Sequence, residues 1–262
     1  HFESHLLREI ENANGTVLRE NVTGLHIENG TKLLQLSNGD GLKIKNVYDS
    51  RPPLVSEGAM YQHFVGLNIQ THDPIFDDST AILMDFRVPQ SSGIHFIYVL
   101  PFSKYSALVE STVYSTEILP KSWYKHQICN YIEQNFPKTT FDIIGEETGA
   151  LPLNNKYPQI PFGIPIGLGA NAMRGSTGYA FSQIMVQLSE LAVNIKSSMN
   201  KTTARSGSTF TEDLMDKIFL DVLSKSPKKA PDIFLTVLER LTGDEFAEFM
   251  TGYCPASTKA KI

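Results

Sequence analysis

Apolar residues at the start of the chain follow a helical period and then give way to short runs typical of strands. Residues 1–12 place apolar side chains at positions 2, 6, 7 and 10, on one side of a helix. Three strand-like runs follow between residues 16 and 48, and the dipeptides Asn29-Gly30 and Asn38-Gly39 between them favour tight hairpins. The pattern predicts a helix followed by a small antiparallel meander.

The densest β-forming sequence lies within residues 61–114. Its four runs are rich in β-branched and aromatic residues, with turn-forming residues between them: Tyr61–Thr71, Ala81–Phe86, His95–Leu100 and Ala107–Tyr114. These runs predict a second antiparallel meander. One carboxylate, Glu110, interrupts the last run, where the burial of an unpaired charge is costly. Alternation leaves its orientation open, because the run is apolar on both faces and a solvated Glu110 fits as well as a buried one.

The second half of the chain is mostly helical in its periodicity. A helix is predicted over Lys121–Asn135, ended by Pro137, and a strand over Phe141–Ile144. Four more helices are predicted at residues 180–199, 210–224, 232–241 and 244–251, with residues 201–208 as a linker. The first of these has an apolar stripe that we expect to face the core: Ile184, Leu188, Leu191 and Ile195.

Two polar or glycine-rich segments are candidates for ligand contact. Asp49-Ser50-Arg51 ends a predicted strand, where it is either a ligand edge or a plain exit turn. Glycines interrupt the apolar segment Ile160–Tyr179, predicted as a strand, and residues without a Cβ let a backbone approach a ligand closely. The sequence Ser176-Thr177-Gly178 then precedes a helix, whose first N–H groups it can direct at an electron-rich group.

Composition narrows the classes of partner. The 262 residues carry a formal net charge of −5 and no basic patch, which argues against binding to a nucleic-acid backbone. Cys129 and Cys254 match no metal-ligand spacing, so we interpret them as reduced and structural in a cytosolic protein and expect no metal site. No run of 18 apolar residues occurs, so no segment is predicted to span a bilayer.

Six segments, spread over roughly residues 16–240, resemble motifs of one family and occur in that family's order. They are Tyr61–Gly66, Met84–Arg87, Leu100–Ser103, Val109–Thr112, Glu147–Pro152 and Gly175–Tyr179. Together they are similar to the bacterial lycopene cyclases, the carotenoid β-cyclase family among the flavoproteins related to glutathione reductase.

The chain departs from the family's pattern at three places. It has no Gly-rich dinucleotide fingerprint near its first residue, which is His rather than Met, so we expect it to begin within the fold. Ser111 stands where the family has a second acid beside the first, which bears on any mechanism that needs two adjacent carboxylates. Near the flavin loop, Gly169-Ala170-Asn171 replaces a Gly-Gly sequence and Gly175 replaces a proline.

The resemblance implies an α/β (α+β) fold of the glutathione-reductase type, which binds FAD or NAD(P). It implies an antiparallel substrate-domain sheet and C-terminal helices, with the N-terminal dinucleotide-binding βαβ unit missing from this chain. The expected division has four parts. Residues 1–60 are the remainder of the FAD-binding domain, 61–152 the substrate and catalytic sheet, 153–200 the return to the FAD domain, and 201–262 a C-terminal helical region.

Family members close the acyclic ψ-end of lycopene to a β-ionone ring without net redox change, using reduced FAD. The resemblance therefore implies that Glu110 is the catalytic acid, because an apolar site raises a carboxyl pKa and keeps it protonated. It also implies an orienting role for Asp85 and Arg87, which a structural ion pair explains equally well. The remaining implied contacts are Arg51, Gly167, Gly169, Ser176, Thr177, Gly178 and Tyr179 for the flavin, and Gln62, Phe102 and Glu147 for the substrate.

The resemblance also implies partners and a location. The cofactor is reduced FAD, with NADPH as a possible electron source, and the substrate is lycopene, which dissolves only in membranes. A cytoplasmic protein that is peripheral at the inner face of the membrane is therefore expected. Two alternatives stay open: another FAD-dependent isoprenoid oxidoreductase, either geranylgeranyl-reductase-like or hydroxylase-like, and an inactive fragment that lacks half of the FAD site.

Overall fold

The computed structural model describes residues 2–28, 31–154, 156–157, 162–196, 210–251 and 255–261. The chain divides into two compact units, residues 1–49 with 160–164 and residues 50–159 with 165–262. This division joins the C-terminal helices to the sheet, and the finer four-part division stays a prediction. Three predicted features, the Asn29-Gly30 turn, the linker at 201–208 and the surroundings of Cys254, lie outside the described residues.

The first unit contains α1 (Phe2–Asn12) and a three-stranded antiparallel sheet in the order β1 (Val22–Glu28), β2 (Thr31–Leu36), β3 (Gly41–Ile44). The predicted helix and meander are confirmed, although the third strand ends at residue 44 and residues 16–18 form no strand. Gly39 has φ +90° in the β2–β3 turn, a left-handed conformation that glycine adopts without steric cost.

A short two-stranded sheet joins β4 (Tyr48–Asp49) and β12 (Ile164–Pro165). Gly163 is required beside this sheet, because a Cβ there would lie 2.3 Å from the carbonyl oxygen of Val47. Asp49 accepts a hydrogen bond of 3.0 Å from the backbone N–H of Phe162. One role of the Asp49-Ser50-Arg51 corner is therefore structural, since Asp49 fixes the backbone at residue 162.

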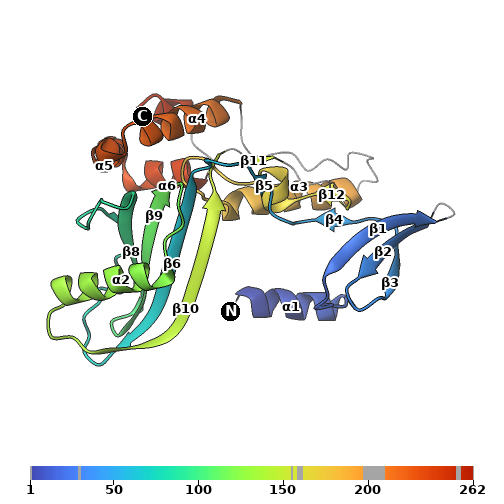
Figure 1. Ribbon diagram of the computed structural model, residues 1–262, viewed down its shortest axis with the longest axis horizontal. Helices are drawn as coiled ribbons and strands as arrows, with labels where there is room; N and C mark the ends of the chain where they lie inside the picture. Colours follow the sequence, from blue (N-terminus) through green and yellow to red (C-terminus); the bar gives the residue numbers. More distant parts are fainter. Residues whose placement is uncertain are drawn as a thin grey trace. The chain divides into compact units, whose positions relative to one another are not determined.

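The second unit is built on a five-stranded antiparallel sheet in the order β10-β6-β9-β8-β7 (Figure 1). The strands are β6 (Tyr61–Thr71), β7 (Ile82–Asp85), β8 (Ile94–Ser103), β9 (Ser106–Ser115) and β10 (Phe141–Pro152). The predicted central meander is confirmed. β10 continues eight residues beyond the predicted end at Ile144, because it pairs with β6 along its whole length. A separate ladder joins β5 (Leu54–Val55) and β11 (Lys156–Tyr157).

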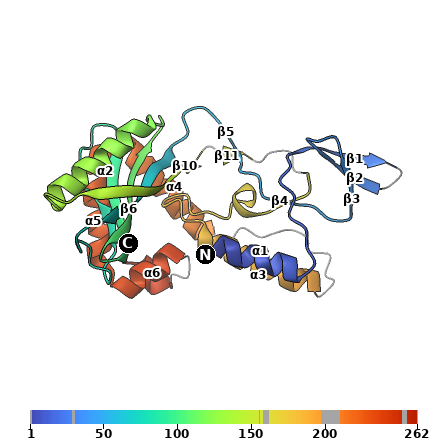
Figure 2. The same ribbon diagram turned by 90° about the horizontal axis from the view of Figure 1, so that it is seen from below.

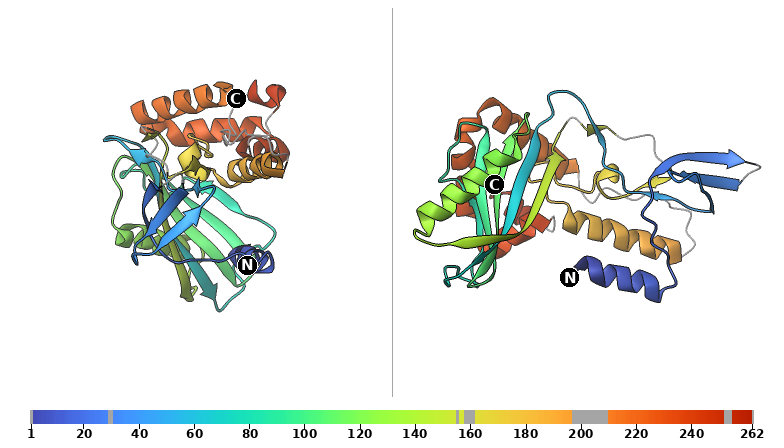
Figure 3. Two further views of the ribbon diagram at one scale, coloured as in Figure 1. Left: turned by 90° about the vertical axis from the view of Figure 1, so that its right-hand side faces the viewer. Right: turned by 60° about the horizontal axis from the view of Figure 1, so that its bottom comes forward.

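One face of the five-stranded sheet is covered by α2 (Lys121–Asn135), which crosses β6 and β9 (Figures 1 and 3). Four of its residues pack on aliphatic side chains of the sheet: Tyr124, Ile128, Tyr131 and Ile132. His63 and His95 are buried on this face and hydrogen-bond through both ring nitrogens. Burial lowers the pKa of His63 to about 4. Both rings are thus structural members of the core.

The other face is covered by C-terminal helices (Figures 2 and 3). The helices after the sheet are α3 (Phe181–Lys196), α4 (Phe210–Lys225), α5 (Ala230–Arg240), α6 (Gly243–Thr251) and α7 (Ala256–Lys259), with a short turn η2 (Pro227–Lys229) between α4 and α5. Leu220, Leu223 and Phe234 pack with Phe96 and Tyr114 of the sheet. Because helices cover both faces of the sheet, the odd-numbered and the even-numbered side chains of β9 both point into the interior.

Two predictions for residues 160–199 were wrong. In place of one apolar strand, the described residues 162–179 form β12, the 3-10 turn η1 (Gly167–Ala170) and an irregular loop. Of the expected apolar stripe on α3, Leu191 is buried as predicted, whereas Leu188 and Ile195 are exposed and Gln183 and Gln187 are buried instead. The side-chain oxygen of Gln187 accepts a 2.6 Å hydrogen bond from the N–H of Gly167, a requirement that hydrophobic periodicity does not reveal.

Cys129 is an exposed free thiol on α2, so its predicted structural role was wrong. No helix in the described part of the chain is both long enough and apolar enough to cross a membrane. Over the same residues, no three His, Cys, Asp or Glu side chains gather in a way that would hold a metal ion.

Candidate functional site

Glu110 lies in a row of residues that crosses the sheet on the face covered by the C-terminal helices. Tyr98 of β8, Glu110 of β9, Gly66 of β6 and Glu147 of β10 are successive partners in the strand register. Opposed residues point to the same face, and with strands about 4.8 Å apart the backbones of the two glutamates are about 10 Å apart. Gly66 leaves room between them, since a Cβ there would lie 2.9 Å from Cγ of Glu147.

The surroundings of Glu110 favour the protonated carboxyl. Desolvation by burial raises its pKa to about 7, and the negative charge of Glu147 acts in the same direction. A hydrogen bond donated by the Thr112 hydroxyl to the Glu110 carboxyl opposes the shift without cancelling it. A carboxyl with this pKa holds a transferable proton at neutral pH, whereas an ordinary exposed glutamate does not.

Ser111, which stands where the family pattern has a second acid, faces the opposite side of the sheet. Its hydroxyl hydrogen-bonds Nε2 of His95 at 2.9 Å, and both residues are buried on the α2 face. Because side chains alternate along a strand, residues 110 and 111 do not share a site whatever their identity. The carboxylate that shares the face with Glu110 is Glu147, although it lies 37 positions further along the sequence and is itself exposed.

Asp85 and Arg87 form an ion pair on the α2 face. Asp85 accepts hydrogen bonds from Nη2 of Arg87 at 2.6 Å and from the Tyr131 hydroxyl of α2 at 2.8 Å. The hydrogen bonds from Arg87 hold the pKa of the Asp85 carboxyl down to about 2. The pair therefore joins β7 to α2, on the opposite face from Glu110, and the orienting role implied for it stays a prediction.

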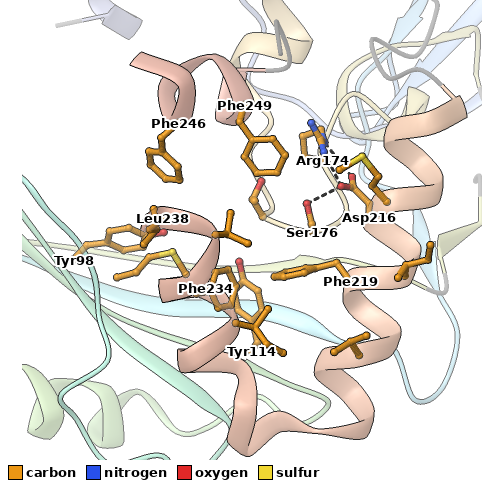
Figure 4. Close-up of a pocket in the computed structure, with 17 residues that line it drawn as sticks. Tyr98, Tyr114, Arg174, Ser176, Asp216, Phe219, Phe234, Leu238, Phe246 and Phe249 are labelled. Atoms are coloured by element: carbon orange, nitrogen blue, oxygen red, sulfur yellow. Dashed lines mark hydrogen bonds and ion pairs between the residues drawn. The ribbon is translucent and has the colours of Figure 1, made fainter. Parts of the chain in front are cut away.

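An apolar cavity of about 300 Å³ lies between the sheet and helices α4, α5 and α6 (Figure 4). Most of its wall is aromatic or aliphatic. The labelled apolar side chains are Tyr98 and Tyr114 from the sheet, Phe219 from α4, Phe234 and Leu238 from α5, and Phe246 and Phe249 from α6. Small-molecule sites are usually concave, mostly apolar and of this size or larger. Tyr98 connects the cavity to Glu110 and Glu147, which we call the carboxylate row, because Tyr98 is the cross-strand partner of Glu110.

A buried polar cluster lines part of the cavity wall away from Tyr98 (Figure 4). Asp216 of α4 accepts hydrogen bonds from Nε and Nη2 of Arg174, from the N–H of Gly175 and from the hydroxyl of Ser176. The guanidinium of Arg174 also lies 5.4 Å from the ring centre of Phe249. Neither Arg174 nor Asp216 was predicted from the sequence. The available signal was that Asp216 lies four and seven positions before Leu220 and Leu223, on the buried side of α4.

The glycine-rich segment before α3 contains the predicted flavin loop. Gly167 has φ +60° and no atom within 4 Å of the place that a Cβ would take, but the residue itself is buried and its N–H is bonded to Gln187. Residues 175–180 lead directly into the N-terminal end of α3, the end of a helix that favours an electron-rich group. Gly167, Gly169 and Gly178 remain predicted flavin contacts, and the Cβ side of Gly178 is occupied by Gln62. The Ser176 hydroxyl bonds to Asp216, and Oγ1 of Thr177 accepts from the N–H of Tyr179.

Gln62 lies against the predicted flavin loop. Gly178 has φ +69°, and a Cβ there would lie 2.2 Å from Oε1 of Gln62, which also accepts a long hydrogen bond from the hydroxyl of Tyr114. Gly178 thus allows the loop to approach the sheet. The fold therefore places the predicted substrate residue Gln62 beside the predicted flavin loop rather than in the carboxylate row.

We expect Gly178→Ala to destabilise the chain by more than about 1 kcal/mol, since it adds both an unfavourable positive φ and a clash with Gln62. The second substitution Gln62→Ala should relieve the clash and restore that part of the stability, while the backbone strain at residue 178 remains. Urea unfolding of the single and double variants measures both contributions. Gly39→Ala has the same sign of φ but no neighbour within 4 Å, so it reports the strain alone. Equal losses for the two single variants would contradict a close approach of the loop.

Two predicted contact residues lie apart from Glu110. Phe102 is exposed at the β8–β9 turn, four residues beyond Tyr98 along the strand. Arg51 is half-buried between β4 and β5. The structure therefore places Glu147 with Glu110, groups Ser176 with Asp216, and leaves the roles of Phe102 and Arg51 as predictions.

The fold resembles solved structures of flavoproteins. HpxO of Klebsiella pneumoniae, determined with FAD and uric acid, superposes with a TM-score of 0.60 at 11% identity, over 95% of this chain and 70% of that one. A geranylgeranyl bacteriochlorophyll reductase-like protein of Thermoplasma acidophilum superposes with a TM-score of 0.56 at 15% identity, over 87% of this chain and 66% of that one. At such identities the likeness concerns the fold, which is that of FAD-dependent flavoproteins.

Sequence comparison gives the family within this class. The family model described as lycopene cyclase protein matches residues 1–260, and the chain belongs to the lycopene cyclase family. Lycopene beta-cyclase of Pantoea ananas is 29% identical over 157 residues, which cover 56% of this chain and 40% of the relative. Lycopene beta-cyclase of Pseudescherichia vulneris is 28% identical over 159 residues, with the same coverage. The predicted family and fold class are confirmed, and the matched region spans about two fifths of these relatives.

Proposed function

We propose that this chain provides the acid and the substrate-binding sheet of a lycopene β-cyclase, which closes the ψ-end of lycopene to a β-ionone ring without net redox change. The observation that carries this proposal is the carboxyl of Glu110, which faces the helix-covered side of the sheet with its pKa raised to about 7. Membership of the lycopene cyclase family supports a carotenoid as the substrate.

Glu110 acts first as an acid. Its proton passes to a carbon of the terminal double bond, and the other carbon of that bond becomes a tertiary cation. Attack by a second double bond of the same chain closes the six-membered ring and moves the positive charge into the ring. An alkene is a weak base, so the donor must be a stronger acid than water and must be shielded from it, which burial of Glu110 achieves.

Glu110 then acts as the base. Its carboxylate, left behind by the first transfer, removes a proton from the ring carbon next to the cation, which leaves the ring double bond and restores the starting carboxyl. The proton count is unchanged over the cycle, so no oxidant or reductant is consumed. Glu147 contributes by repulsion, because its charge makes the ionised form of Glu110 less favourable and so promotes return of the proton.

Reduced FAD would be held by the loop around Gly167 and residues 175–179, and when bound it would supply electron density that stabilises positive charge. NADPH would be the source of the reducing electrons. Backbone N–H groups at the start of α3, the glycines of η1 and Thr177 are the groups of this chain that would hold the flavin. Tyr98 and Tyr114 add ring faces near Glu110, and burial raises the pKa of both hydroxyls, so the rings stay neutral.

The location follows from the substrate. Lycopene partitions into bilayers, so we infer a cytoplasmic protein that works at the inner face of the membrane as a peripheral protein. The runner-up function is that of a geranylgeranyl-reductase-like or hydroxylase-like oxidoreductase, because the fold is shared with such flavoproteins. Glu110 favours the cyclase, since hydride transfer or hydroxylation does not require a protonated carboxyl on this face of the sheet.

The test uses cells that accumulate lycopene and carry the longest reading frame that contains this sequence. We expect conversion of red lycopene to yellow or orange cyclic carotenoids of the same mass, identified by chromatography and mass spectrometry. The sequence as it stands, expressed alone, tests whether it is active by itself. A product heavier by two hydrogens or one oxygen would identify the reaction as reduction or hydroxylation and would rule out the cyclase.

A further inference from the structure

The aromatic cavity offers few polar groups to a ligand. Its polar cluster is engaged internally, because Asp216 binds Arg174 and Ser176 within hydrogen-bond distance. In the described residues no buried side-chain nitrogen or oxygen is without a hydrogen-bond partner. The hydroxyls of Tyr98, Tyr114 and Thr177 are the remaining polar groups of the wall, and they replace only a small part of a polar ligand's hydration, whereas an apolar ligand would only bury surface. The cavity therefore favours hydrocarbon.

The cavity wall is most exposed on α4, and we place the opening of the cavity there. Among its wall residues, Ile218 and Val222 are the most exposed, at 55% and 40% of their surface. They continue an exposed apolar stripe at every fourth position of the helix, which begins with Phe210 and Leu214. An amphipathic helix of a water-facing surface normally carries polar residues at such positions. The stripe thus leads from the outer surface of α4 to the mouth of the cavity.

The opposite end of the cavity reaches the carboxylate row. Tyr98 belongs to the cavity wall and is the direct cross-strand partner of Glu110. A volume of about 300 Å³ is at the lower limit of small-molecule sites, so it holds one segment of a long ligand rather than the whole of it. A linear chain that enters at Ile218 would be led past the rings of α5 and α6 toward Tyr98.

We propose that this cavity is the binding site for a linear polyisoprenoid segment, which enters between the exposed side chains of α4 at Ile218 and Val222 and extends toward Tyr98. The identification of the ligand as the cyclase's polyene rests on the proposed function. The location of the site and its selectivity for apolar chains rest on the cavity alone.

Filling the cavity tests its occupancy. Val237 and Leu235 lie two residues apart on α5, but only Val237 belongs to the cavity wall and Leu235 is exposed. We expect Val237→Trp to weaken binding of the methyl ester of parinaric acid, a linear conjugated tetraene, by about tenfold or more through loss of buried apolar area. The matched control Leu235→Trp should bind within about twofold of the unchanged chain. Fluorescence titration measures both.

Ile233→Trp, at a second wall position of α5, is measured alongside so that the result does not depend on one variant. Circular dichroism establishes that each variant is folded. Unchanged tetraene affinity in folded Val237→Trp and Ile233→Trp would overturn the proposal. The assay needs neither flavin nor turnover. The two proposals can therefore fail separately. If the unchanged chain forms no cyclic carotenoid but the cavity-filling variants still lose tetraene binding, the proposed function is rejected and the binding site stands.

The entrance is tested separately on α4. Ile218 and Leu214 are both exposed on the apolar stripe, one helical turn apart, but only Ile218 belongs to the cavity wall. We expect Ile218→Glu to slow association of the tetraene several-fold in stopped-flow mixing, because an apolar chain must then pass an ionised carboxylate. Leu214→Glu should leave the association rate unchanged. Equal rates for both variants would place the entrance elsewhere and overturn that part of the proposal.

Discussion

Replacement of Glu110 by glutamine should lower the rate of ring closure by about 10²–10⁴-fold, the usual contribution of a positioned general acid. Glutamine keeps the shape of the side chain and accepts the hydrogen bond from Thr112, but it has no proton to deliver to an alkene. The rate of formation of cyclic carotenoid from lycopene in vesicles measures the effect. Flavin content should be unchanged, since the glycines of the predicted flavin loop lie in another segment of the chain.

The matched control for this variant is the neighbouring position. Ser111→Ala alters a residue on the α2 face and breaks its hydrogen bond to His95, so it should lower stability while leaving the chemical step intact. If Glu110→Gln retained full activity, or if Ser111→Ala lost as much, Glu110 would not be the acid.

The pH dependence of the same group has a definite sign. Glu110 releases its proton at pH about 7 in the folded chain and near 4.5 in the unfolded chain. Activity that needs the protonated acid should therefore fall as pH rises through about 7. Stability should also fall as pH rises from 4.5 to 7, because the unfolded chain loses this proton first. Glu110→Gln should remove this contribution to the stability profile.

Removal of the Asp216 carboxylate should destabilise the second unit by about 3–5 kcal/mol, because it takes a bidentate ion pair away from the buried guanidinium of Arg174. The loss is large against a typical unfolding free energy of about 5–15 kcal/mol. It also removes the bonds to Gly175 and Ser176 that fix the loop before α3. Asp216→Ala should therefore lower both the denaturant midpoint and the affinity for FAD, measured by urea unfolding and by flavin fluorescence.

Asp221→Ala is the control on the same helix. Asp221 is exposed and five residues further along α4, so its removal should change stability by no more than about 0.5 kcal/mol. A loss below about 1 kcal/mol in Asp216→Ala would show that the cluster is not an integral part of the fold.

The elements that were predicted well are those in which local pattern and tertiary pairing agree. Residues 61–71 and 121–135 form a strand and a helix with the predicted bounds, because each has continuous periodicity and clear ends. β10 was underestimated, because residues 145–149, which follow the predicted end, are polar or glycine and owe their strand geometry to pairing with β6. The stripe of α3 was misjudged for a related reason, since Gln187 is buried by a hydrogen bond to a distant turn.

The sequence by itself determined the two meanders, the C-terminal helices, the family resemblance and the choice of Glu110 as the candidate acid. Only the tertiary structure decided which face Glu110 takes, because alternation in a strand buried on both sides has no preferred phase. Strand register alone placed Glu147 across Gly66 from Glu110, and helix packing alone brought Asp216 to Arg174. These contacts join positions more than 35 residues apart, and no local pattern along a chain encodes which distant residues will meet.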